Sequence, residues 1–267
     1  MRSKEPSRAD QQLLQELRRR KCEVSFPKIE RWRYWRKTGL VPRTVQHGLG
    51  RGSTSEHADL DESVARICEV VQLRKQYRSL DEIALVLTMR HRPLDPTSVK
   101  QALLAVIAAQ HRSFLGDSDP DDPIAVAHNA VLALKHQGSH AAKASGFRTG
   151  EAAMTAAQVL AGADVQQAQV EEFVEGTPIS SIASELGYAT SDVTAVIAPA
   201  MPFANYASLL STIEAAAPQA VVEAIHTAND LVARYMPPRV LATATGRDFA
   251  IVGVAVSLLL LATHADT

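Results

Sequence analysis

The segment KIERWRYWRKTGLVP, residues 28–42, constrains the fold of this chain more than any other stretch. It contains no β-type alternation, and successive residues of an α-helix advance by about 100 degrees. On such a helix Ile29, Trp32 and Trp35 cover one broad side, and cationic residues cover the rest. The segment therefore predicts a helix over about 27–38 whose indoles pack against neighbouring helices and whose opposite face is cationic.

The residues on both sides of this segment predict further short elements. Gly39 can end the helix in a left-handed conformation, and Pro42 prevents its continuation. Residues 10–20 place leucines on one side and charges on the other, which predicts a preceding helix. Residues 44–57 are rich in glycine and lack a helical period, so we expect a hairpin or loop there.

Helical periodicity returns after this Gly-rich stretch. An apolar stripe begins near Asp61, and SLDE at residues 79–82 matches a capping box, in which Ser79 and Glu82 satisfy free backbone amides at a helix start. Another helix is predicted over residues 97–114.

Charge divides the chain into two parts. Residues 1–116 contain 22 Lys and Arg against 13 Asp and Glu, whereas residues 117–267 contain 6 against 16. GDSDPDDP, residues 116–123, disfavours helix, and we place a domain boundary there. The basic part predicts a polyanionic partner, and the Ala-rich acidic part predicts a bundle of five to eight helices without clear strands.

Several classes of protein are disfavoured by the remaining features. The two cysteines form no CxxC pair, so neither a disulfide framework nor a zinc site is indicated, and we expect a reducing cytoplasm. The polar N-terminus lacks the apolar core of a secretory signal. Residues 249–265 are uncharged but fall short of a typical membrane span, which favours a buried helix over a membrane tail.

Basic residues are densest around the aromatic segment. Between Lys28 and Arg51 the chain has seven Lys or Arg and a single acid, Glu30. Cations at this density neutralise phosphates and release counterions, although a solvated basic helix over an ordinary core is the alternative interpretation. The residues that we expect to contact DNA are Lys28, Arg31, Arg33, Tyr34, Arg36, Lys37, Arg43 and Arg51.

WRYWRKTGLVP, residues 32–42, resembles the LRYYE-x-x-GLL-P segment of the MerR-type winged helix-turn-helix regulators. A first helix, a Gly-rich wing and the SL-x-E-I start of a later helix occur in the matching order, so the resemblance covers about residues 10–92. It implies an all-α fold with a small β-wing: an N-terminal winged helix-turn-helix domain, here followed by a C-terminal helical bundle. It also implies a homodimeric transcription regulator with helix 27–38 in the major groove of double-stranded DNA, and residues 97–114 are the candidate dimerisation helix.

The resemblance carries over to particular residues. It implies that Arg33 and Tyr34 touch the DNA backbone, that Trp35 replaces the second tyrosine of the family, and that Leu40 and Val41 form the packing pair after the turn. Arg51 lies in the implied wing.

The chain departs from the family at three positions. Thr54 and His57 stand where the family commonly has Arg and Tyr, which puts the wing contacts in doubt. Arg36 replaces the usual Glu and alters the local ion pairing.

Other functions find less support in the sequence. No Walker loop, GxSxG or HExxH motif occurs, so we expect neither enzymatic activity nor a cofactor. His136 and His140 lack a third ligand, and no metal site is predicted. Residues 178–197 share the packing pattern of a helix-turn-helix but lack cations in their second helix, which favours a core hairpin.

The role of the acidic part is left open. It offers a dimerisation surface or a pocket for a small-molecule or protein effector. The rival hypotheses are a protein-interaction adaptor that uses the helix-turn-helix and the acidic bundle, and a membrane-tethered regulator.

Overall fold

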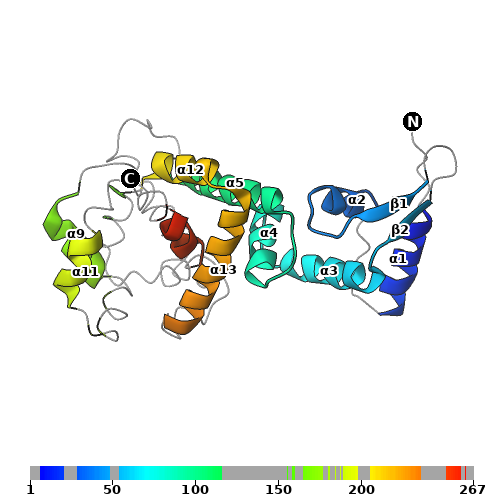
Figure 1. Ribbon diagram of the computed structural model, residues 1–267, viewed down its shortest axis with the longest axis horizontal. Coiled ribbons are helices and arrows are strands. Elements are labelled where there is room, and N and C mark those ends of the chain that lie inside the picture. The colour runs from blue at the N-terminus through cyan, green and yellow to red at the C-terminus, as the bar shows by residue number, and fades with distance from the viewer. Residues whose placement is uncertain are drawn as a thin grey trace.

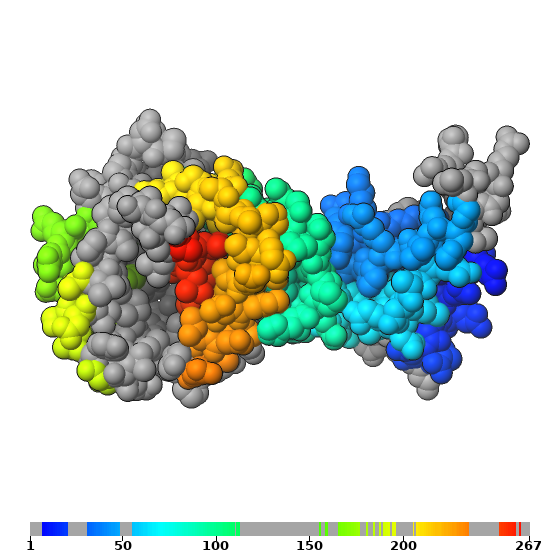
Figure 2. Space-filling model, in the orientation of Figure 1, coloured from blue at the N-terminus to red at the C-terminus, as the bar shows by residue number. Residues whose placement is uncertain are grey.

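The computed structural model describes residues 7–20, 29–48, 54–115, 165–176, 189–197, 205–235 and 251–259, with the single positions 155, 158, 159, 180, 184, 187 and 262. The molecule is elongated, and its N-terminal elements form a lobe at one end (Figure 1). The described helices of the second half of the chain lie toward the other end, as the space-filling view also shows by its colours (Figure 2). Helices with one small antiparallel sheet make up the described architecture, which agrees with the predicted all-α class with a small β-element.

Helix α1 (Arg8–Arg19) begins at a reciprocal cap. The Ser7 hydroxyl accepts from the Asp10 amide at 3.2 Å, and the Asp10 carboxylate accepts from the Ser7 amide at 3.2 Å. Leu13 and Leu17 are buried, as the sequence predicts, and Asp10 is buried as well. The cap and the apolar face together fix the start of the helix and its orientation on the core.

Helix α2 (Ile29–Lys37) confirms the two predictions made for its indoles and its end. Trp32 and Trp35 are buried in the core of the lobe. Gly39 has a φ of 78°, and its amide donates to the Arg36 carbonyl at 3.3 Å. The chain then turns inward through Leu40 and Val41, which are both buried. The left-handed glycine therefore lets the chain reverse while the indole face stays packed.

Strands β1 (Thr44–His47) and β2 (Thr54–His57) form a hairpin, the first of the two alternatives expected for residues 44–57. They pair antiparallel with Thr44 opposite His57 and His47 opposite Thr54. Nε2 of His57 donates to the Ala9 carbonyl at 3.2 Å, and its Nδ1 lies 3.1 Å from the Ser63 hydroxyl. A single imidazole thus fixes the hairpin to α1 and to the following helix.

Three helices lead from the hairpin to the middle of the molecule. They are α3 (Leu60–Leu73), α4 (Leu80–Met89) and α5 (Pro96–Leu115). The predicted capping box at α4 is confirmed, because Ser79 accepts from the Glu82 amide at 3.0 Å and Glu82 accepts from the Ser79 amide at 2.9 Å. Every residue of α4 from Ile83 to Met89 is buried, so this helix is covered on all sides.

The later described helices are α9 (Gln167–Glu175), α11 (Thr190–Ile197), α12 (Tyr206–Ala215) and α13 (Pro218–Tyr235). Helices α12 and α13 pack against α5, and α13 also packs against α4 (Figure 1). Nζ of Lys100 on α5 donates to the Glu214 and Ala216 carbonyls at 2.6 and 2.8 Å. Helices on both sides of the predicted 116–123 boundary therefore share one apolar core, and the boundary segment lies outside the described residues.

The candidate dimerisation helix, residues 97–114, coincides with α5. Because α4, α12 and α13 of the same chain cover it, a second copy has only its remaining surface to contact.

Residues 251–259 are helical, and Ile251, Ala255, Val256 and Leu259 are buried in the same core, which agrees with the buried-helix interpretation of residues 249–265. Among the described residues, no helix has both the length and the hydropathy needed to cross a bilayer.

One prediction about the cysteines is wrong. Cys68 on α3 is disulfide-bonded, although the spacing of the cysteines gave no indication of a disulfide. A sequence pattern reports only local spacing, whereas a disulfide requires proximity in space. The expectation of a reducing compartment loses the support that it drew from unpaired cysteines.

Candidate nucleic-acid interface

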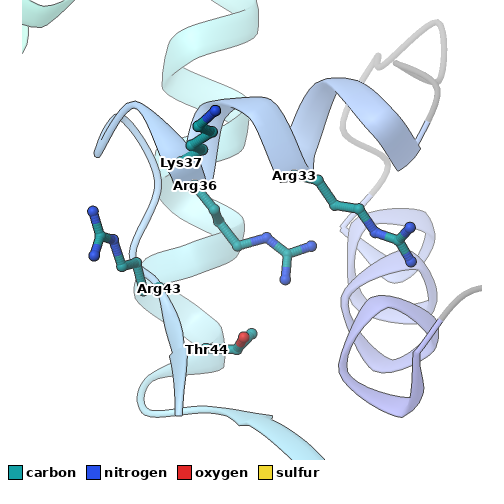
Figure 3. Close-up of a pocket in the computed structure, with 5 residues that line it drawn as sticks. All are labelled: Arg33, Arg36, Lys37, Arg43 and Thr44. Carbon is teal, nitrogen blue, oxygen red and sulfur yellow. The ribbon is translucent and has the colours of Figure 1, made fainter. Parts of the chain in front are cut away.

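An open cationic pocket lies where α2 meets β1. It has a volume of about 290 Å³ and is lined by Arg33, Arg36, Lys37, Arg43 and Thr44. Figure 3 shows the first three side chains leaving α2 and the last two rising from the start of the hairpin. We call this concavity the α2–β1 pocket.

Local chain geometry explains why these residues meet. Arg33, Arg36 and Lys37 are three and four residues apart, a spacing that places side chains on one helix face. The turn at Gly39 reverses the chain, and Arg43 returns beside that face. The pocket thus follows from the same helix end that buries Leu40.

A buried carboxylate on α1 pairs with two arginines of the pocket. Oδ2 of Asp10 accepts from Nη2 of Arg33 at 3.2 Å, and its Oδ1 accepts a close hydrogen bond from Nη2 of Arg36. The Asp10 side chain is only 2% exposed, compared with 45% for Arg33 and 11% for Arg36. Four cations against one carboxylate leave the pocket positive.

The pKa of Asp10 reflects opposing effects. Burial alone raises the pKa of this carboxyl group, but hydrogen bonds from Arg36, Ser7 and Arg33 and the charge of Arg36 lower it further than burial raises it. The net pKa lies below the usual value, so the group is ionised at neutral pH.

The other predicted contact residues differ in their placement. Arg31, Lys37 and Arg43 are exposed, and Tyr34 is 54% exposed although its neighbours Trp32 and Trp35 are buried. Lys28 and Arg51 lie outside the described residues.

Arg36, which we expect to contact DNA and to alter the local ion pairing, is largely buried against Asp10 and pairs with it. At the hairpin, the ring of His57 contacts Ala9 of α1 and Ser63 of α3. Sequence reasoning also missed Asp10 and Thr44. The S-x-x-D pattern of residues 7–10 signals a helix cap, but no local pattern indicates that the same carboxylate reaches α2.

Other candidate sites gain no residues from the structure. No group of His, Cys, Asp and Glu suited to a metal ion occurs in the described part of the chain, and His136 and His140 lie outside it. Most of the 178–188 segment of the second helix-turn-helix look-alike is likewise outside it, while α11 packs against α9.

Comparisons of the chain with protein-family models, with curated proteins and with solved structures found no match.

Proposed function

We propose that this chain is a DNA-binding transcription regulator of the MerR-like winged helix-turn-helix type, with α2 in the major groove and the β1–β2 hairpin as its wing. The observation that carries the proposal is the α2–β1 pocket, which is lined by four cationic side chains.

The dimensions of α2 support insertion into a groove. Nine residues form a rod about 13 Å long, and an α-helix with its side chains fits the major groove of B-DNA. The core holds this rod by Trp32 and Trp35, which leaves Arg31, Arg33 and Lys37 exposed on the solvent side.

The chemistry of the pocket suits a backbone phosphate. Guanidinium groups donate paired hydrogen bonds to phosphate oxygens, and the Lys37 ammonium adds a point charge. The Thr44 hydroxyl is a further donor at the pocket rim. Tyr34 also stands exposed on α2, where its phenol is available to a neighbouring phosphate.

A homodimer on a two-fold operator is part of the proposal, because two copies double the number of phosphate contacts. We assign no catalysis, cofactor or metal to the chain. Residues 117–267 are the part of the chain proposed to take an effector, whether a small molecule or a protein.

The proposal is tested by binding of the full chain to random-sequence duplex DNA, measured by fluorescence anisotropy over a salt series. The logarithm of affinity should fall linearly with the logarithm of salt concentration, with a slope of about 0.9 per phosphate contacted. Lys37→Ala should reduce that slope by about one, whereas Lys75→Ala, which removes the same charge from an exposed position outside the pocket, should not.

Base recognition needs a second measurement, namely selection of bound duplexes from a random library. Arg33→Ala and Tyr34→Phe should weaken binding to all sequences equally, as losses of phosphate contacts do. Arg31→Ala should relax the preference at one base position. If the wild-type chain fails to retard duplex DNA even at low salt, the proposal is refuted and the protein-interaction adaptor becomes the better hypothesis.

A further inference from the structure

Asp10 is an unusual neighbour for a phosphate-binding pocket, because a carboxylate repels the anion that the pocket would bind. It is nevertheless one of the few buried charged groups among the described residues. A buried carboxylate is tolerated when its oxygens are satisfied by donors, and Asp10 meets this condition.

The donors come from two separate elements. Nη2 of Arg36 donates to Oδ1, and Nη2 of Arg33 donates to Oδ2 at 3.2 Å. The Ser7 amide and hydroxyl donate to the same Oδ2 at 3.2 and 2.9 Å. One carboxylate therefore joins the N-terminus of α1 to two arginines one turn apart on α2.

The burial of Arg36 shows how firmly this pairing holds the guanidinium. Its Nε is shielded from solvent and has no hydrogen-bond partner among the described residues. The guanidinium of Arg36 is held instead through its Nη2, which donates to Asp10. A long arginine side chain normally loses much rotamer freedom when it binds a ligand. A side chain already fixed by Asp10 loses less.

We propose that Asp10 is a positioning residue for anion binding, which holds Arg33 and Arg36 against the α2–β1 pocket so that they meet one backbone phosphate without reordering. The inference rests on the proposed DNA binding. Each arginine uses Nη2 for Asp10, and a guanidinium carries several N–H donors, so pairing with the carboxylate is compatible with contact to a phosphate.

Charge and positioning predict opposite results for Asp10→Asn. If Asp10 were only a repulsive charge, its removal would strengthen binding and steepen the salt slope by about one. If Asp10 positions the arginines, affinity should fall about tenfold despite the gain of positive charge, which is the size of one lost charge-assisted hydrogen bond.

The full chain with Asp10→Asn is therefore titrated with random-sequence duplex DNA at several salt concentrations. Ser7→Ala is the matched control, because it also breaks the α1 cap but leaves both arginine pairs in place. Both variants should melt at a lower temperature, and only Asp10→Asn should bind DNA more weakly. Asp10→Glu, which keeps the charge, should recover part of the affinity.

A second readout separates positioning from general loss of structure. In an Arg33→Ala, Arg36→Ala background, Asp10→Asn should cause no further loss of affinity, because the groups that it positions are gone. Equal or tighter binding by Asp10→Asn in the wild-type background would overturn the inference and leave the proposed function intact. Absence of DNA binding by the wild-type chain would overturn both.

Discussion

Trp32 and Trp35 form a matched pair for measuring the cost of a buried polar group without a partner. Both lie on α2, where they are 0% and 5% exposed. The Nε1–H of Trp32 is buried with no hydrogen-bond acceptor among the described residues, and the indole of Trp35 is not in this situation. Replacing either residue by Phe therefore removes a similar amount of apolar contact, but only Trp32→Phe removes an unpaired donor.

The two effects have comparable sizes and opposite signs at Trp32. Loss of the extra ring atoms costs about 1–2 kcal/mol, at roughly 0.8 kcal/mol for each buried carbon-sized group. Removal of a buried, unpaired N–H raises the free energy of unfolding by about 1–3 kcal/mol, because the folded state no longer bears the desolvation cost of that group. We expect Trp32→Phe to shift the free energy of unfolding by between about −1 and +2 kcal/mol and Trp35→Phe to lower it by about 1–2 kcal/mol.

Denaturant unfolding of the full chain, followed by circular dichroism, measures both values because the helical signal does not depend on the tryptophans. Hydrogen exchange in α2 localises the effect to this helix. Trp32→Ala, which empties the site, should cost about 3–5 kcal/mol and serves as the positive control for packing. If Trp32→Phe destabilises as much as Trp35→Phe, the N–H carries no desolvation penalty and the reasoning is refuted.

Three further perturbations test the same lobe. Gly39→Ala should lower stability by about 1–2 kcal/mol because the φ of 78° strains a residue with a Cβ, and Gly39→Asn should cost less; equal costs would contradict this explanation. Arg66 is fully buried, two of its nitrogens have no partner among the described residues, and its Nη2 donates to Glu62 at 2.6 Å. Arg66→Met should therefore leave the free energy of unfolding unchanged or raise it by about 1–4 kcal/mol, whereas Glu62→Gln should lower it. Burial lowers the pKa of His57 more than its bond to the Ala9 carbonyl raises it. Below about pH 6.5 the unfolded chain therefore binds a proton at this histidine more readily than the folded protein does. Wild-type stability should therefore fall as the pH drops from about 6.5, and His57→Gln should flatten that decline in urea titrations; parallel pH profiles would count against it.

Local chemistry accounts for the elements that could be predicted. The capping box at Ser79, the left-handed end at Gly39 and the buried indoles of α2 each depend on residues within a few positions of one another. The glycines and the missing helical period of residues 44–57 predict a hairpin or loop, and the structure has the hairpin. Such features are visible in a sequence because helix ends and amphipathic faces are short-range properties.

The candidate site could be predicted only in part. The exposed cations Arg31, Lys37 and Arg43 were expected from charge density, and their exposure agrees. The pairing of Arg36 with Asp10 joins residues 26 positions apart, and nothing in either neighbourhood indicates the other. The inward turn of His57 depends in the same way on the position of Ala9 in a different helix.

By itself the amino-acid sequence determined which segments are helical, where several of them begin and end, and which face of α2 is apolar, because these outcomes follow from backbone geometry and from side chains a turn apart. The tertiary structure alone decided that Asp10 reaches two arginines, that Lys100 caps α12 and that helices from the basic and acidic parts share one core. Those contacts depend on how packed helices cross, and many residues distant in sequence set that geometry together.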